Sequence, residues 1–118
     1  MTGTPAPVHN VNCICITDEK TKEIISVICF DKYEDSYGVI FGCTAESYRG
    51  MGYYRRLFNG LVRHAKKDGV NFIYSNYNEK NEESKLMHEA LGRKKTDFID
   101  DEVYTVFDIA ENSQNEAR

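Results

Sequence analysis

Two glycines, Gly50 and Gly52, stand one residue apart where the sequence pattern changes from that of a strand to that of a helix. A strand-like run over residues 37–44 precedes them, and an amphipathic segment follows. Glycines at such a turn leave backbone N–H groups uncovered by side chains, and the helix dipole adds partial positive charge there. The turn is therefore predicted to hold an anion such as a phosphate group.

Three strand-like segments, joined by short polar turns, make up the first part of the chain. Residues 11–17 alternate in side-chain character, residues 23–30 are apolar on both faces, and residues 37–44 lead into the glycines. Both patterns are typical of strands that contribute to a buried sheet. Because the connections are short, we expect the three strands to be antiparallel neighbours.

The apolar period changes to that of a helix after Gly52. Leu57, Leu61 and Ala65 recur at four-residue spacing, which places them on one helix face, and Gly69 supplies a stop. The segments predicted beyond this helix are a strand at 70–74, a helix at about 81–91 that ends at Gly92, and a strand over 98–109 with a break near 100–101.

The predicted order β-β-β-α-β-α-β(-β) indicates an α/β fold of the α+β kind. Its sheet is expected to be mixed but mostly antiparallel, with two principal helices. A chain of 118 residues suits one domain. We expect this domain at 11–110, between a flexible leader at 1–10 and a polar tail at 111–118.

Charge and hydropathy exclude two classes of partner. A formal net charge of −4 argues against general nucleic-acid binding, which favours a basic surface. No apolar run approaches the roughly 20 residues that a membrane-spanning helix needs. The first residues show no secretory pattern of a basic and then an apolar segment, so a cytoplasmic location is expected.

The four cysteines are predicted to be reduced core thiols. Cys13, Cys15 and Cys29 fall inside apolar strand-like runs, and Cys43 lies in the strand before the glycine turn. No second cysteine or histidine pair stands at zinc-ligand spacing from Cys13 and Cys15. The sequence therefore predicts no metal site.

The glycine turn fits the pattern Arg/Gln-x-x-Gly-x-Gly/Ala. Arg49 occupies the first position and Gly52 the fourth. Tyr54 stands at the sixth position, where the pattern usually has a small residue.

A second motif lies downstream at a fixed distance from the first. Asn81 is followed seven positions later by His88, and then by Gly92 and Arg93, where the corresponding pattern reads Asn, Tyr and Gly-Phe. The two motifs, set in this order of strands and helices, resemble those of the GCN5-related N-acetyltransferase (GNAT) family over residues 11–109. Some members of that family carry bulky residues after the first glycine, as this chain does.

The resemblance implies that the chain moves an acetyl group from acetyl-coenzyme A to an amine. The acceptor would be a protein or a small molecule. In this family the pantetheine arm of the donor lies alongside the central strand, and the pyrophosphate lies on the glycine turn. The positions that correspond to the arm are Gly42, Cys43 and Thr44, and those that correspond to the pyrophosphate are Arg49, Gly50, Met51, Gly52, Tyr53 and Tyr54.

The resemblance also suggests a catalytic residue. His88 stands where the family usually has a tyrosine that protonates the coenzyme A thiolate, and an imidazolium can supply that proton. Asn81 would either contact the pantetheine arm or cap the second helix. No general base is singled out, and Asp35, Glu46 and Tyr37 are the conceivable candidates.

The chain departs from the family pattern at its N-terminus, and further alternatives for its function stay open. The chain is N-terminally reduced, with ten residues before Val11, so the usual acceptor wall would be absent or supplied by a homodimer partner. Tyr54, His88 and Arg93 are also compatible with a catalytically inactive binding or interaction module. An acyltransferase that uses a longer acyl chain or a non-amine acceptor is a further alternative.

Overall fold

A six-stranded sheet in the order β1-β2-β3-β4-β6-β5 forms the centre of the computed structural model, which describes residues 11–116. The strands are β1 (Asn12–Thr17), β2 (Ile24–Tyr33), β3 (Ser36–Thr44), β4 (Phe72–Asn78), β5 (Lys94–Ile99) and β6 (Glu102–Asp108). The helices are the short 3-10 helix η1 (Glu46–Tyr48), α1 (Tyr53–Lys67), α2 (Glu82–Ala90) and α3 (Ile109–Glu116). The mixed, mostly antiparallel fold predicted from the sequence is confirmed. None of the described helices is long and apolar enough to cross a membrane.

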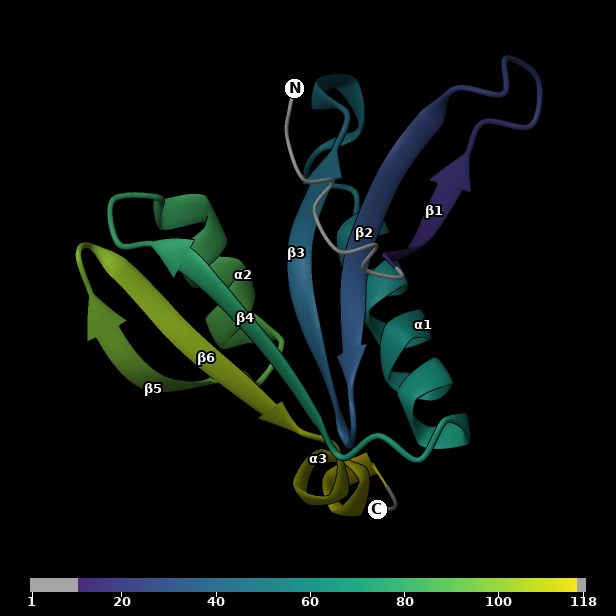
Figure 1. Ribbon diagram of the computed structural model, residues 1–118. Coiled ribbons are helices and arrows are strands. Elements are labelled where there is room, and N and C mark those ends of the chain that lie inside the picture. Colours follow the sequence, from purple (N-terminus) through teal and green to yellow (C-terminus); the bar gives the residue numbers. More distant parts are fainter. Residues whose placement is uncertain (1–10, 117–118) are drawn as a thin grey trace, which may run out of the picture.

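The sheet contains one parallel pair, β3 with β4, and this pair is short. Ser36, Tyr37 and Gly38 pair with Phe72, Ile73 and Tyr74, whereas all other strand neighbours are antiparallel. Beyond these residues the two strands diverge into a V, which Figure 1 shows between the label of β3 and that of β4. Residues 39–44 of β3 therefore have a strand neighbour on one side only, which is β2.

The core lies between the sheet and the two longer helices, which cover the same face of the sheet (Figure 1). α1 packs on β1, β2 and β3, while α2 packs on β4. The buried row of α1 consists of Leu57, Phe58, Leu61, Val62 and Ala65, as the four-residue spacing predicts. Its burial against the sheet supplies the main driving force for forming this helix.

The opposite face of the sheet has no helix over it among the described residues, and the cysteines lie there. All four are free, but Cys13, Cys15 and Cys43 are exposed and Cys29 is half-buried. The prediction that they are core thiols is therefore wrong. The reason is the strand period of two, because Ile14 packs against the core and its neighbours in β1 must face away from it.

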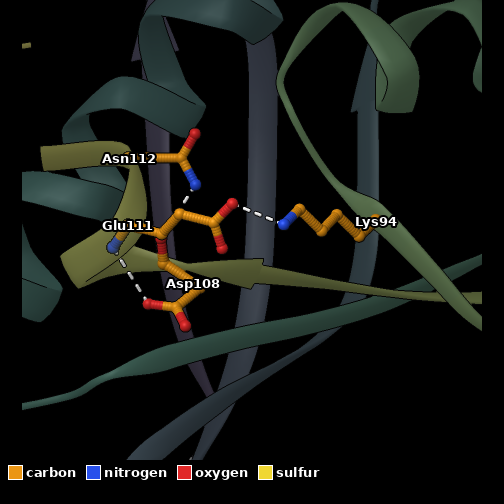
Figure 2. A network of polar contacts seen from close by, with 4 residues as sticks. All are labelled: Lys94, Asp108, Glu111 and Asn112. Carbon is orange, nitrogen blue, oxygen red and sulfur yellow. Dashed lines mark hydrogen bonds and ion pairs between the residues drawn. The ribbon is translucent and has the colours of Figure 1, made fainter. Parts of the chain in front are cut away.

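Helix α3 occupies part of the segment that was expected to be a polar tail. Asp108, the residue before the helix, caps its N-terminus, because its carboxylate accepts a hydrogen bond from the N–H of Glu111 at 3.1 Å. Figure 2 shows two further contacts: the Asn112 amide donates to the Asp108 carbonyl at 2.8 Å, and Lys94 of β5 pairs with Glu111. The expected leader at 1–10 lies outside the described residues.

Candidate active site

A groove of about 840 Å³ extends from the glycine turn into the V between β3 and β4. The first residues of α1 and the inner side of α2 complete its walls. Met51 does not line it and is 64% exposed. The groove brings together the remaining residues predicted to bind the cofactor or to catalyse: Gly42, Cys43, Thr44, Arg49, Gly50, Gly52, Tyr53, Tyr54, Asn81 and His88.

The glycine turn has the backbone geometry that the sequence predicts. Gly50 and Gly52 have φ values of 79° and 82°, a left-handed conformation that other residues rarely adopt. Gly52 is the N-cap of α1, and no side chain caps this helix end. The first bond of the helix runs from the Arg56 N–H to the Gly52 carbonyl at 3.1 Å, so the N–H groups of the preceding turn have no helical partner. A Cβ atom added at Gly50 or Gly52 would meet nothing within 4 Å, so no neighbouring group fills the space beside the turn, which suits an anion.

Arg49 holds the turn in place. Its Nε donates to the Thr44 carbonyl at the end of β3, at 3.1 Å, and its backbone N–H donates to the Glu46 carbonyl at 3.3 Å. The Tyr48 N–H donates to the Ala45 carbonyl at 2.9 Å. The arginine side chain is therefore used to fasten the turn to the strand, and the anion would be bound by backbone groups.

The ring of Tyr54, in the first turn of α1, packs against strand β3 and does not fill the space beside the glycine turn. A Cβ atom added at Gly42 would stand 2.6 Å from Cε1 and 2.7 Å from the hydroxyl oxygen of Tyr54, whereas one added at Gly50 or Gly52 would meet nothing within 4 Å. The bulky sixth residue of the motif thus does not cover the phosphate position. Its ring packs against Gly42 on the helix-covered face of β3, because Gly42 lies opposite the buried Ile28 in the pairing with β2.

The family assignment follows from a comparison of the whole sequence. The model of the acetyltransferase (GNAT) family matches residues 5–92, which is more than half of the chain. The chain belongs to the GNAT family. No curated protein matches this GNAT sequence.

Solved structures show the same fold at low sequence identity. The ribosomal-protein-S18-alanine N-acetyltransferase of Escherichia coli has a TM-score of 0.75 at 15% identity, over 87% of this chain and 72% of that one. The PaiA N-acetyltransferase of Thermoplasma acidophilum, solved with coenzyme A, has a TM-score of 0.78 at 11% identity, over 83% and 60%. An acetyltransferase of Desulfovibrio desulfuricans has a TM-score of 0.77 at 13% identity, over 84% and 69%.

Asn81 caps helix α2 of this GNAT domain. Its side-chain oxygen accepts a hydrogen bond from the Ser84 N–H at 3.0 Å, which is the capping role that the sequence allowed. Asn81 also lines the groove. The second role expected for it, contact with the pantetheine arm, would take place there.

His88 is buried and, in its preferred state, neutral. Its Nδ1 lies 2.7 Å from the Ser84 carbonyl oxygen, which can only accept, so Nδ1 carries the proton. Nε2 is then a lone-pair acceptor, buried and without a partner among the described residues. Burial, and next the Arg93 charge, lower the His88 pKa to about 4, against a smaller opposite effect of the Ser84 carbonyl. The imidazolium form that the sequence suggested as proton donor is therefore disfavoured at neutral pH.

None of the three conceivable bases lines the groove. Tyr37 is 1% exposed and donates to Asp68 at 2.8 Å, and burial together with that carboxylate raises its pKa. Asp35 and Glu46 lie outside the groove walls. Glu83, in the first turn of α2, is the carboxylate that does line the groove, and sequence reasoning did not single it out.

Arg93 also belongs to the site, although the sequence analysis gave it no role beyond a departure from the family pattern. It is 6% exposed, and its guanidinium carbon lies 4.1 Å from the centre of the Phe58 ring. Its Nη1 donates to the Ser75 hydroxyl at 3.0 Å. Burial lowers the Arg93 pKa, and the nearby Tyr54 hydroxyl partly offsets this effect. The one sign of its role in the sequence was a charged residue at the position where the family pattern has phenylalanine.

The low pKa of His88 predicts a loss of stability in mild acid. In the unfolded chain the ring returns to its ordinary pKa of 6.5, so between that value and about 4 the unfolded state binds more protons than the folded one. Stability should therefore fall as the pH drops through this range, by about 2 kcal/mol once solvent screening is allowed for. Urea unfolding at pH 7 and pH 5 measures the effect.

His88→Asn, which retains a donor near the Nδ1 position, should reduce this dependence on pH. His64→Gln is the matched control, because His64 is exposed on α1. Equal pH dependence in the wild-type protein and the His88→Asn variant would contradict the prediction.

Proposed function

We propose that this GNAT domain binds acetyl-coenzyme A in the groove and transfers the acetyl group to an amine. The observation that carries the proposal is the continuity of the groove. It joins an uncovered anion-binding turn at Gly50 and Gly52 to the unpaired edge of β3. A pyrophosphate fits the first feature, and an extended amide-bearing arm fits the second, because residues 39–44 can pair with it as a strand would.

The proposed reaction is a direct attack on the thioester. The amine nitrogen forms a bond to the carbonyl carbon, the carbon–sulfur bond breaks, and the thiolate takes up a proton as the nitrogen loses one. A backbone N–H on the free edge of β3, at Gly42 to Thr44, would stabilise the oxyanion.

For His88 we propose a different role from that of acid. Its unpartnered Nε2 can accept a hydrogen bond from an amide N–H of the pantetheine arm. The proton for the thiolate is assigned to solvent in the groove, because the imidazolium form is scarce at neutral pH when the pKa is about 4.

The acceptor is proposed to approach from the uncovered face of the sheet. Ile40, Phe41, Tyr74 and Tyr104 are exposed, and they could contact an amine-bearing protein segment or small molecule. A second copy of the chain that placed a strand or loop beside this face would form part of the acceptor site as a homodimer.

Two measurements test the proposed function. Coenzyme A at about 100 times its Kd should stabilise the protein by about 2.7 kcal/mol, which is visible as a rise in Tm. Acetyl-coenzyme A with a panel of primary amines should release free thiol. Binding without thiol release would favour the alternative, an inactive GNAT-fold binding module. Absence of any thermal shift at millimolar coenzyme A would contradict the donor site itself.

A further inference from the structure

The groove contains a buried cation with no counter-ion among the described residues. Arg93 is 6% exposed, and no carboxylate in residues 11–112 forms an ion pair with it. Its contacts are the Ser75 hydroxyl, the face of the Phe58 ring and the nearby Tyr54 hydroxyl, all of them uncharged groups. A buried charge without a partner is strongly destabilising, so an arginine here points to a partner outside the described residues, such as a ligand in the groove.

The unpaired edge of the Arg93 guanidinium has the geometry of a carboxylate-binding site. Nη1 is bonded to Ser75, while Nε and Nη2 are buried without a hydrogen-bond partner in the described structure. Nε and Nη2 form the side edge of the planar group and present two nearly parallel N–H donors. This edge matches the two oxygens of a carboxylate, whereas a single carbonyl oxygen would leave one donor unpaired.

The position of Arg93 links this edge to the acyl end of the donor. The pairing of β3 with β4 ends at Gly38 and Tyr74, and the next residue of β4 is Ser75, to which Arg93 is bonded. The guanidinium therefore lies at the point where the V closes, on the wall of the groove. A pantetheine arm that enters from the glycine turn and follows the free edge of β3 carries its acyl group toward this point.

From these observations we infer that Arg93 binds a carboxylate at the far end of the acyl chain, so that the groove proposed for acetyl-coenzyme A also takes a short dicarboxylic acyl-coenzyme A, such as succinyl-coenzyme A, and binds it more tightly. Tyr54, whose hydroxyl lies near Arg93, lines the same groove. This assignment rests on the proposed function, because it requires the donor to occupy the groove.

Calorimetric titration with three ligands tests the inference. Coenzyme A reports on the donor groove alone, succinyl-coenzyme A adds the carboxylate, and 4-methylpentanoyl-coenzyme A replaces the carboxylate with an isopropyl group of similar shape. The wild-type protein should bind succinyl-coenzyme A at least about 10-fold more tightly than its neutral analogue, as expected for charge-assisted hydrogen bonds.

Arg93→Met should abolish this preference, because methionine has a similar length and no charge. Its affinity for coenzyme A should stay within about twofold of wild type, which also shows that the variant is folded. Arg93→Lys should keep part of the preference as a point charge without the bidentate edge.

The outcomes separate the two proposals. If the wild-type protein fails to bind coenzyme A, the proposed function fails. If coenzyme A binds but succinyl-coenzyme A shows no advantage, or Arg93→Met leaves the advantage unchanged, the carboxylate site on the acyl chain is refuted. A third outcome would place the carboxylate on the acceptor and overturn the assignment. In it, Arg93→Met would keep the donor preference of the wild-type protein but react more slowly with the acceptor β-alanine, while its rate with β-alaninamide, which has no carboxylate, would not change.

Discussion

Replacing Gly52 with aspartate should weaken coenzyme A binding by at least about 100-fold while leaving the domain folded. Gly52 is the N-cap of α1, and the space beside its Cα is empty. A carboxylate there would itself accept from the free N–H groups at the start of the helix and would repel a phosphate. Aspartate also tolerates the left-handed conformation better than most residues, so the helix should remain capped.

Gly52→Asn is the matched control for this prediction, because it has the same shape and no charge. It should cost far less affinity than Gly52→Asp, and the difference should shrink as the salt concentration rises. Equal losses in the two variants would show that crowding at the turn, and not anion binding, determines affinity. Calorimetric titration at two salt concentrations measures both effects, and thermal unfolding checks the fold.

Replacing Phe58 with alanine should remove about 3–5 kcal/mol of stability. Phe58 is 1% exposed and stands edge-on to Phe107, with 5.1 Å between ring centres. The substitution would leave a cavity beneath the sheet, and it would also take away the ring face on which the Arg93 guanidinium lies. Since small domains have about 5–15 kcal/mol in all, much of the fold's stability depends on this one side chain.

Urea unfolding at neutral pH measures the loss. Phe98→Ala is the control, since Phe98 on β5 is 53% exposed and the same truncation there should change stability by less than about 1 kcal/mol. A loss below about 1 kcal/mol for Phe58→Ala would contradict the place of Phe58 in the core.

The elements that the sequence predicted best are those with a strong apolar period or special backbone. Helix α1 follows its four-residue row, and the break expected near 100–101 is the turn between β5 and β6, where Asp100 and Asp101 have φ values of 50° and 69°. The start of β5 was placed too late, at 98. Lys94 begins this edge strand, whose residues are all exposed, so no alternation marks them.

The site was predicted in outline but not in its chemistry. The glycine turn and the positions along β3 could be read from local spacing, and the structure brings most of them into one groove. The direction of the Tyr54 ring, the burial of His88 and the unpaired edge of Arg93 depend on how α1, α2 and β4 pack together. Local sequence patterns do not carry that information, because burial sets the protonation of His88 through contacts between distant segments.

The short parallel join between β3 and β4 also has a consequence for the order in which the chain folds. β1, β2 and β3 are linked by short turns, so their contacts are local and carry a small loop-closure cost. The three residue pairs between β3 and β4 join segments that are separated in the sequence by the whole of α1, and such non-local contacts form slowly. We therefore expect the floor of the V to assemble late in folding.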